Sequence, residues 1–80
     1  MKSLNDIKVG ESCFIEKIET KGSMRRRFMD IGLIENTQVE CVLQSPSKDP
    51  KAYLIRGAVI AIRSEDCADI LVRSEENGAY

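Results

Sequence analysis

The sequence predicts a mainly β fold, a small antiparallel barrel of about five short strands with one short α-helix. Three observations support this prediction. Most apolar residues alternate with polar ones over segments of strand length, and turn-forming residues separate these segments. One stretch alone has its apolar residues at helical spacing. The chain has 80 residues, which allows a single domain with a compact core.

The first predicted strand covers residues 11–19. Cys13 and Ile15 alternate with polar neighbours, and the apolar pattern then shifts by one position to Ile18. A shift of this kind is typical of a β-bulge in a curved sheet. We therefore expect this strand to bend.

A single helix is predicted over residues 24–31, because its apolar residues recur at the spacing of one buried face. Ser23 is expected to cap the N-terminus through its hydroxyl group. Gly32 is expected to end the helix in the left-handed conformation, with Leu33 packing back on the last turn. The apolar residues of the buried face are Met24, Phe28 and Ile31.

The remaining strands are predicted from the same alternation. A loop with two prolines separates the second strand from an antiparallel hairpin, which turns at Arg56 and Gly57. A short helical turn is expected before the last strand. The predicted ranges are 38–43 for the second strand, 44–50 for the loop, 52–63 for the hairpin, 64–68 for the helical turn and 69–73 for the last strand.

The predicted domain covers residues 1–73. Residues 74–80 have no apolar periodicity, and we expect them to form a flexible C-terminal tail. An antiparallel sheet of this size avoids open edges by curling on itself. The fold class is therefore a small SH3-like or OB-like β-barrel.

Composition excludes several classes of function. The net charge of −1 gives the protein no general attraction to nucleic acid or to an anionic membrane. The N-terminal segment has no apolar targeting core, and no apolar run approaches the roughly 20 residues of a membrane span. Three widely spaced cysteines disfavour a disulfide framework. We expect a cytoplasmic protein with no nucleic-acid partner and no membrane insertion.

The chain contains no histidine, which removes the commonest general base and the commonest transition-metal ligand. It also has no GxSxG motif and no glycine-rich phosphate loop. With only four aromatic residues, it offers little surface on which single-stranded nucleic acid could stack. We predict that the protein is not an enzyme.

One acidic segment has mixed metal-ligand chemistry. Glu65, Asp66 and Asp69 surround Cys67, and such a set could hold Fe²⁺ or Zn²⁺ weakly. Because the chain has neither a CxxC motif nor an imidazole, a solvated acidic turn is the favoured interpretation. We predict no tightly bound cofactor, and at most weak Fe²⁺ or Zn²⁺ binding at these four residues.

Three consecutive arginines, Arg25, Arg26 and Arg27, occupy the first turn of the predicted helix, where the helix dipole disfavours cations. Arg26 is expected to pair with Asp30 four residues later. The other two, with an exposed Met29, are predicted to form a docking surface for carboxylates of a partner. The alternative is that the arginine stems cover an apolar flank of the barrel.

The helix segment RRRFMDIGL, residues 25–33, is similar to an Arg-Arg-Leu-x-x-Leu-Gly-Leu signature. With four other segments in the same order, it makes residues 4–72 resemble the FeoA family of ferrous-iron-transport accessory proteins. Asn36 and Lys48 stand where that family usually has glycine. The other segments are the turn at Val9 and Gly10, the loop SPSKDP, Gly57 with IAIR, and CADILV.

The resemblance implies an SH3-like barrel with a cytoplasmic role beside FeoB, the membrane transporter of Fe²⁺. We predict a non-catalytic module that docks on the cytosolic portion of FeoB through Arg25, Arg27 and Met29 and modulates the transporter. The alternative is a regulatory metal-binding or peptide-binding domain, similar to the C-terminal SH3-like domain of iron-dependent repressors. Direct regulation of DNA is not expected, because the chain has no winged-helix segment.

Overall fold

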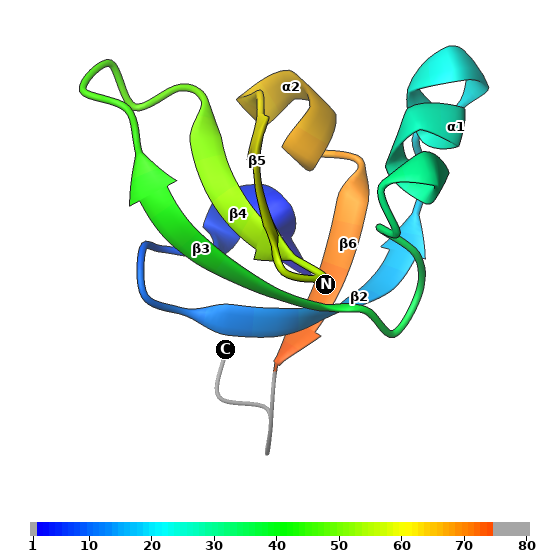
Figure 1. Ribbon diagram of the computed structural model, residues 1–80, viewed down its shortest axis with the longest axis horizontal. Helices are drawn as coiled ribbons and strands as arrows, with labels where there is room; N and C mark the ends of the chain where they lie inside the picture. Colours follow the sequence, from blue (N-terminus) through cyan, green and yellow to red (C-terminus); the bar gives the residue numbers. More distant parts are fainter. Residues whose placement is uncertain (1, 75–80) are drawn as a thin grey trace.

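Six antiparallel strands form one curled sheet in the computed structural model, which describes residues 2–74 (Figure 1). The order of strands across the sheet is β1-β6-β2-β3-β4-β5. This architecture confirms the predicted SH3-like barrel. The strands are β1 (Lys2–Ser3), β2 (Ser12–Ile18), β3 (Gln38–Gln44), β4 (Lys51–Ile55), β5 (Ala58–Ile62) and β6 (Ile70–Ser74); the helices are η1 (Leu4–Asp6), α1 (Gly22–Asp30) and α2 (Ser64–Cys67).

Two features of the sheet differ from the sequence prediction. The two residues of β1 pair with Leu71 and Val72 of β6, a contact too short to leave any periodic pattern in the sequence. Strand β6 continues to Ser74, which pairs with Cys13, one residue beyond the predicted domain boundary. The predicted flexible tail otherwise lies outside the described residues.

The predicted bend in the first strand is confirmed. Pairing of β2 with β6 shifts register between Ile15 and Lys17, so Glu16 is the extra residue of a β-bulge. A second shift lies in β3, between Cys41 and Leu43. These bulges increase strand twist, which allows a six-stranded sheet of short strands to curl.

The core lies inside the curled sheet and consists almost entirely of apolar side chains. Cys13, Cys41 and Cys67 are all buried as thiols rather than joined in disulfides, and they pack there as small hydrophobic groups. Tyr53 of β4 is fully buried, with its hydroxyl group 3.3 Å from the carbonyl oxygen of Leu4.

The short helix η1 closes one side of the barrel through side-chain hydrogen bonds from distant segments. The Lys51 ammonium group donates to the carbonyl oxygens of Asn5 and Ile7, each at 2.9 Å. The Asn5 amide in turn donates to the carbonyl oxygen of Ser64, at 2.9 Å. Strand β4 and helix α2 are therefore tied to the N-terminal segment.

Two residues other than glycine have φ angles just above 70°. Asn36 has φ 71° and Lys48 has φ 73°, both in the left-handed region. Asparagine adopts this region readily, whereas a lysine there is disfavoured by about 1 kcal/mol or more. Lys48 therefore carries local backbone strain.

We expect Lys48→Gly to raise the free energy of unfolding by about 0.5–1 kcal/mol. Glycine relieves the left-handed strain, although its greater freedom in the unfolded chain offsets part of the gain. Urea denaturation of the two proteins measures the difference. Lys17→Gly in β2 is the control and should lower stability, because it adds glycine where the backbone is extended. A lower stability for Lys48→Gly would contradict the prediction.

Candidate functional site

Helix α1 begins earlier than the sequence predicts. Lys21 is the extended N-cap residue, and it makes no side-chain capping hydrogen bond. Gly22 has φ 71°, so the chain turns at this glycine and Ser23 already lies within the first helical turn. The predicted Ser23 cap is wrong, because a capping side chain must come from the residue before the helix.

The C-terminus of α1 confirms the prediction. Gly32 has φ 86°, and its N–H donates to the carbonyl oxygen of Met29 at 3.0 Å. The N–H of Leu33 donates to the carbonyl oxygen of Phe28 at 2.8 Å, and the Leu33 side chain is fully buried. This pair of hydrogen bonds is a Schellman motif, which fixes the direction in which the chain leaves the helix.

Helix α1 packs on the barrel through a narrow apolar face. Phe28 is buried, whereas Met24 and Ile31 are only partly buried against the core. The helix consequently stands beside the sheet (Figure 1). A groove of about 370 Å³ is lined by residues of α1, β5 and α2.

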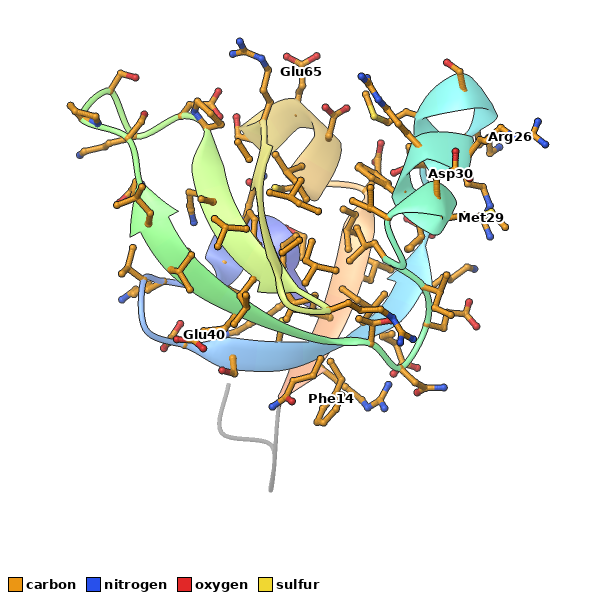
Figure 2. All side chains as sticks on the ribbon, viewed as in Figure 1. Phe14, Arg26, Met29, Asp30, Glu40 and Glu65 are labelled. Atoms are coloured by element: carbon orange, nitrogen blue, oxygen red, sulfur yellow. The ribbon has the colours of Figure 1, made fainter. Side chains whose placement is uncertain are left out.

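The three residues predicted to form one docking surface lie on two sides of α1. Arg25 and Met29 line the same surface hollow, and Met29 is 55% exposed. Arg27 lines the groove that faces β5. Figure 2 shows Met29 and Arg26 on the outer side of α1. Arg25 also links α1 to the end of β2, because its Nη1 donates to the carbonyl oxygen of Ile18 at 2.6 Å.

The predicted ion pair between Arg26 and Asp30 is not formed. Within residues 2–74, the one ion pair joins Arg73 to Glu16, at 2.9 Å. Arg26 instead extends away from the helix into solvent (Figure 2). An exposed pair gains little energy in water and must restrict two flexible side chains, so its absence has little cost.

The four candidate metal ligands do not converge. Cys67 is buried, with its Sγ 3.5 Å from the hydroxyl oxygen of Tyr53, whereas Glu65 and Asp69 are exposed. Figure 2 shows Glu65 pointing outward from α2. Across residues 2–74, no three His, Cys, Asp or Glu side chains are grouped as metal ligands. Burial also raises the pKa of the Cys67 thiol to about 11, which disfavours the thiolate that a metal requires.

Stability is expected to fall between about pH 9 and pH 11. Burial, only partly offset by the hydrogen bond with Tyr53, raises the pKa of Cys67 from 9.0 to about 11 in the folded protein. Above pH 9 the unfolded chain loses this proton first, so the stabilisation present at lower pH is lost, up to about 3 kcal/mol. Denaturation at several pH values measures the slope. Cys67→Ala should reduce the slope, and an unchanged slope would contradict this assignment.

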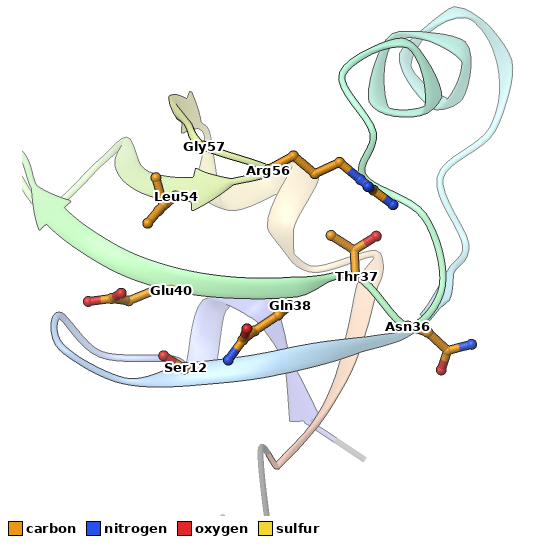
Figure 3. A pocket seen from close by; sticks show the side chains of 8 residues that line it. All are labelled: Ser12, Asn36, Thr37, Gln38, Glu40, Leu54, Arg56 and Gly57. Atoms are coloured by element: carbon orange, nitrogen blue, oxygen red, sulfur yellow. The ribbon is translucent and has the colours of Figure 1, made fainter.

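A second pocket, of about 430 Å³, lies on the outer face of β3 and β4 (Figure 3). Its two charged residues do not act together, because Arg56 extends toward the loop after α1 and away from Glu40. The Arg56 Nε donates to the carbonyl oxygen of Gly32 at 3.3 Å, and a Cβ atom at Gly32 would lie 2.6 Å from Arg56 Cδ. This pocket therefore holds a structural arginine and no convergent chemical group.

The sequence matches a known protein family over all the described residues. The family model described as the FeoA domain matches residues 2–74. The chain belongs to the FeoA family. A curated relative from Porphyromonas gingivalis, a fusion of Fe²⁺ transport protein A with the Fe²⁺ transporter FeoB, is 29% identical over 69 residues. That match covers 86% of this chain and 8% of the fusion protein, so the chain spans a small part of the relative's length.

Solved structures of FeoA proteins have the same fold. The FeoA-like protein from Clostridium acetobutylicum has a TM-score of 0.82 and 26% identity, covering 98% of this chain and 91% of its own. Zinc-complexed FeoA from Stenotrophomonas maltophilia, described as a prokaryotic SH3 domain protein, has a TM-score of 0.79 and 17% identity, with coverages of 90% and 89%. A manganese-dependent transcriptional repressor has a TM-score of 0.82 and 19% identity, with coverages of 91% and 36%.

Two residues that line the groove beside α1 could not be identified from the sequence. Arg63 and Ile60 line the groove beside α1, although they are distant from the helix in sequence. Their alternating pattern identifies a strand but not its place at the edge of the sheet.

Within residues 2–74, no helix has the length and apolar character needed to cross a membrane.

Proposed function

We propose that this chain is a cytosolic, non-catalytic accessory factor of ferrous iron uptake that docks on the cytosolic portion of a FeoB-type transporter and modulates it. The observation that carries the proposal is the fusion relative, in which a homologous domain is part of the same polypeptide as FeoB. Domains joined in one chain act at high effective concentration, which favours a direct contact between them.

The exposed side of α1 supports this docking mode. Arg25 presents a guanidinium group next to the exposed thioether of Met29, and Arg27 presents a second cation on the groove side. Guanidinium groups bind carboxylates through paired hydrogen bonds, and methionine adapts to irregular apolar surfaces. We therefore place the partner on α1, with acidic side chains against its arginines.

A role without catalysis or resident metal fits the side chains that are present. The chain has no histidine. The thiol of Cys67 points into the core, away from the acidic residues of α2. The zinc described for the S. maltophilia protein therefore has no matching ligand set around Cys67, and Fe²⁺ is the transporter's cargo in this proposal rather than a cofactor.

The second candidate function is a regulatory peptide-binding or metal-binding domain. The observation that favours it is the similarity to the manganese-dependent repressor, which has this barrel as part of a longer chain. Binding of Fe²⁺, Zn²⁺ or Mn²⁺ with sub-micromolar affinity, abolished by Cys67→Ser, would favour this function over docking on FeoB.

Calorimetric titration against the cytosolic portion of a FeoB-type transporter tests the proposal. We expect saturable binding, weakened at least about thirtyfold in the double variant Arg25→Glu and Arg27→Glu, the equivalent of about 2 kcal/mol. Arg26→Glu is the matched control and should change affinity less than about threefold. Because Arg25 also holds the Ile18 carbonyl group, thermal unfolding of each variant accompanies the titration. Equal binding by the double variant and the parent would refute docking through these arginines.

A further inference from the structure

Strand β5 is an edge of the sheet that contains no charged residue, no proline and no β-bulge. The sheet ends at β1 on one side and at β5 on the other. Edge strands are usually short, charged, bulged or interrupted by proline. Strand β1 has only two residues, whereas β5 has the sequence AVIAI and pairs with β4 in regular register along its whole length.

The side chains of β5 are largely uncovered. Val59 is 63% exposed, Ala58 and Ala61 are exposed, and Ile60 is half-buried. The groove of about 370 Å³ described above lies between this strand and α1. Its apolar lining comes from Ile60, Ala61 and Ile62 of β5, from Met24 and Phe28 of α1, and from Ile31, which follows α1.

The same groove has a cationic rim. Arg27 of α1 and Arg63, which follows β5, both line it. In the part of the chain that the structure describes, neither guanidinium group has an ion pair, since the one pair present joins Arg73 to Glu16. Asp66 contributes a single half-buried carboxylate to the lining. Two unpaired cations over an apolar surface select an occupant that is apolar and acidic.

We propose that the free edge of β5 binds an extended, acidic-flanked apolar segment of a partner protein by strand addition. The main chain of the segment pairs with β5 and continues the sheet. Its alternate side chains pack on Met24, Phe28 and Ile31, and its carboxylates pair with Arg27 and Arg63. The inference rests on the proposed function only for the identity of the partner protein. Whether β5 binds an extended segment is tested with a synthetic peptide, without the transporter.

A second copy of this chain is a poorer occupant of the edge. Antiparallel pairing of two β5 strands about a twofold axis at Ile60 places Gly57 opposite Arg63 of the second copy. Arg56 and Arg63 of both copies then gather around one short ladder, and like charges at that distance repel. An acidic partner instead removes the unpaired positive charge.

The test uses the full chain, labelled with ¹⁵N, and the synthetic peptide Glu-Val-Thr-Val-Thr-Val-Glu with blocked ends. We expect saturable shifts in the amide signals of β5 and α1. A peptide with the same side chains but N-methyl groups on alternate residues should bind at least about tenfold more weakly, because it lacks the donors of a β-ladder. Equal binding of the two peptides, or no binding of either, would overturn strand addition.

Charge reversal tests the cationic rim. The double variant Arg27→Glu and Arg63→Glu should bind the acidic peptide at least about tenfold more weakly and prefer the same peptide with lysine at both ends. Arg26→Glu, outside the groove, is the matched control and should leave both affinities unchanged. Dimerisation of the chain through β5 would overturn the choice of occupant. Tighter peptide binding after removal of residues 75–80 would also overturn this choice. It would mean that these residues of the chain itself compete with the peptide for the groove.

Discussion

Phe28→Ala is expected to lower the free energy of unfolding by about 3 kcal/mol and to release α1 from the barrel. Phe28 is the one residue of α1 that is buried, and its neighbours Met24 and Ile31 are only partly covered. Truncation of a buried aromatic ring loses its transfer free energy and leaves a cavity. Because α1 has little other contact with the core, we expect most of the disorder to remain local.

Hydrogen exchange separates local release from global unfolding. Amides of residues 22–31 should lose protection in Phe28→Ala, whereas those of β2, β3 and β6 should keep more of theirs. Met29→Ala is the matched control, since Met29 lies on the same helix but is 55% exposed, and it should change stability by less than about 0.5 kcal/mol. Equal loss of protection in helix and sheet would show that α1 is an integral part of the core.

Lys51→Met is expected to lower the free energy of unfolding by about 2 kcal/mol. The Lys51 ammonium group donates to the carbonyl oxygens of Asn5 and Ile7, and methionine keeps the chain length but removes both hydrogen bonds. Hydrogen bonds from charged donors are stronger than neutral ones, and partly buried acceptors left without a donor are costly. We expect η1 to separate from β4 as a result.

Urea denaturation and NMR measure these two effects. Amide signals of η1 should move in Lys51→Met, with smaller changes at the distant helix α1. Lys17→Met is the matched control, because Lys17 is an exposed lysine of β2, and it should be nearly neutral. An unchanged free energy of unfolding in Lys51→Met would contradict the closure of the barrel by this side chain.

The sequence predicts the elements whose signals are local. The end of α1 depends on Gly32 followed by apolar Leu33, and the bulge in β2 depends on a shift of the apolar pattern by one residue. Strand β1 and the closure by Lys51 could not be predicted, because both depend on contacts between segments more than forty residues apart. A lysine in a strand gives no sign of which carbonyl groups it will reach.

The candidate site was predictable only in part. The exposed position of Met29 follows from the helical repeat, which also places Arg25 beside it and Arg27 on another side. The groove depends on the gap between α1 and β5 and on Arg63, and neither can be read from local periodicity. Adjacency in sequence likewise does not reveal that Cys67 turns into the core and away from Glu65 and Asp69, which are exposed.

Under the two proposals above, α1 and the edge of β5 form the surface that meets the transporter. The most direct test is an NMR titration of the ¹⁵N-labelled chain with the unlabelled cytosolic portion of a FeoB-type transporter. The predicted result is loss or movement of amide signals in residues 22–31 and 58–63, with little change on the outer face of β2 and β3. Unchanged spectra at saturating concentrations of the partner, or changes confined to that outer face around Ser12, Gln38 and Glu40, would contradict docking through α1 and β5.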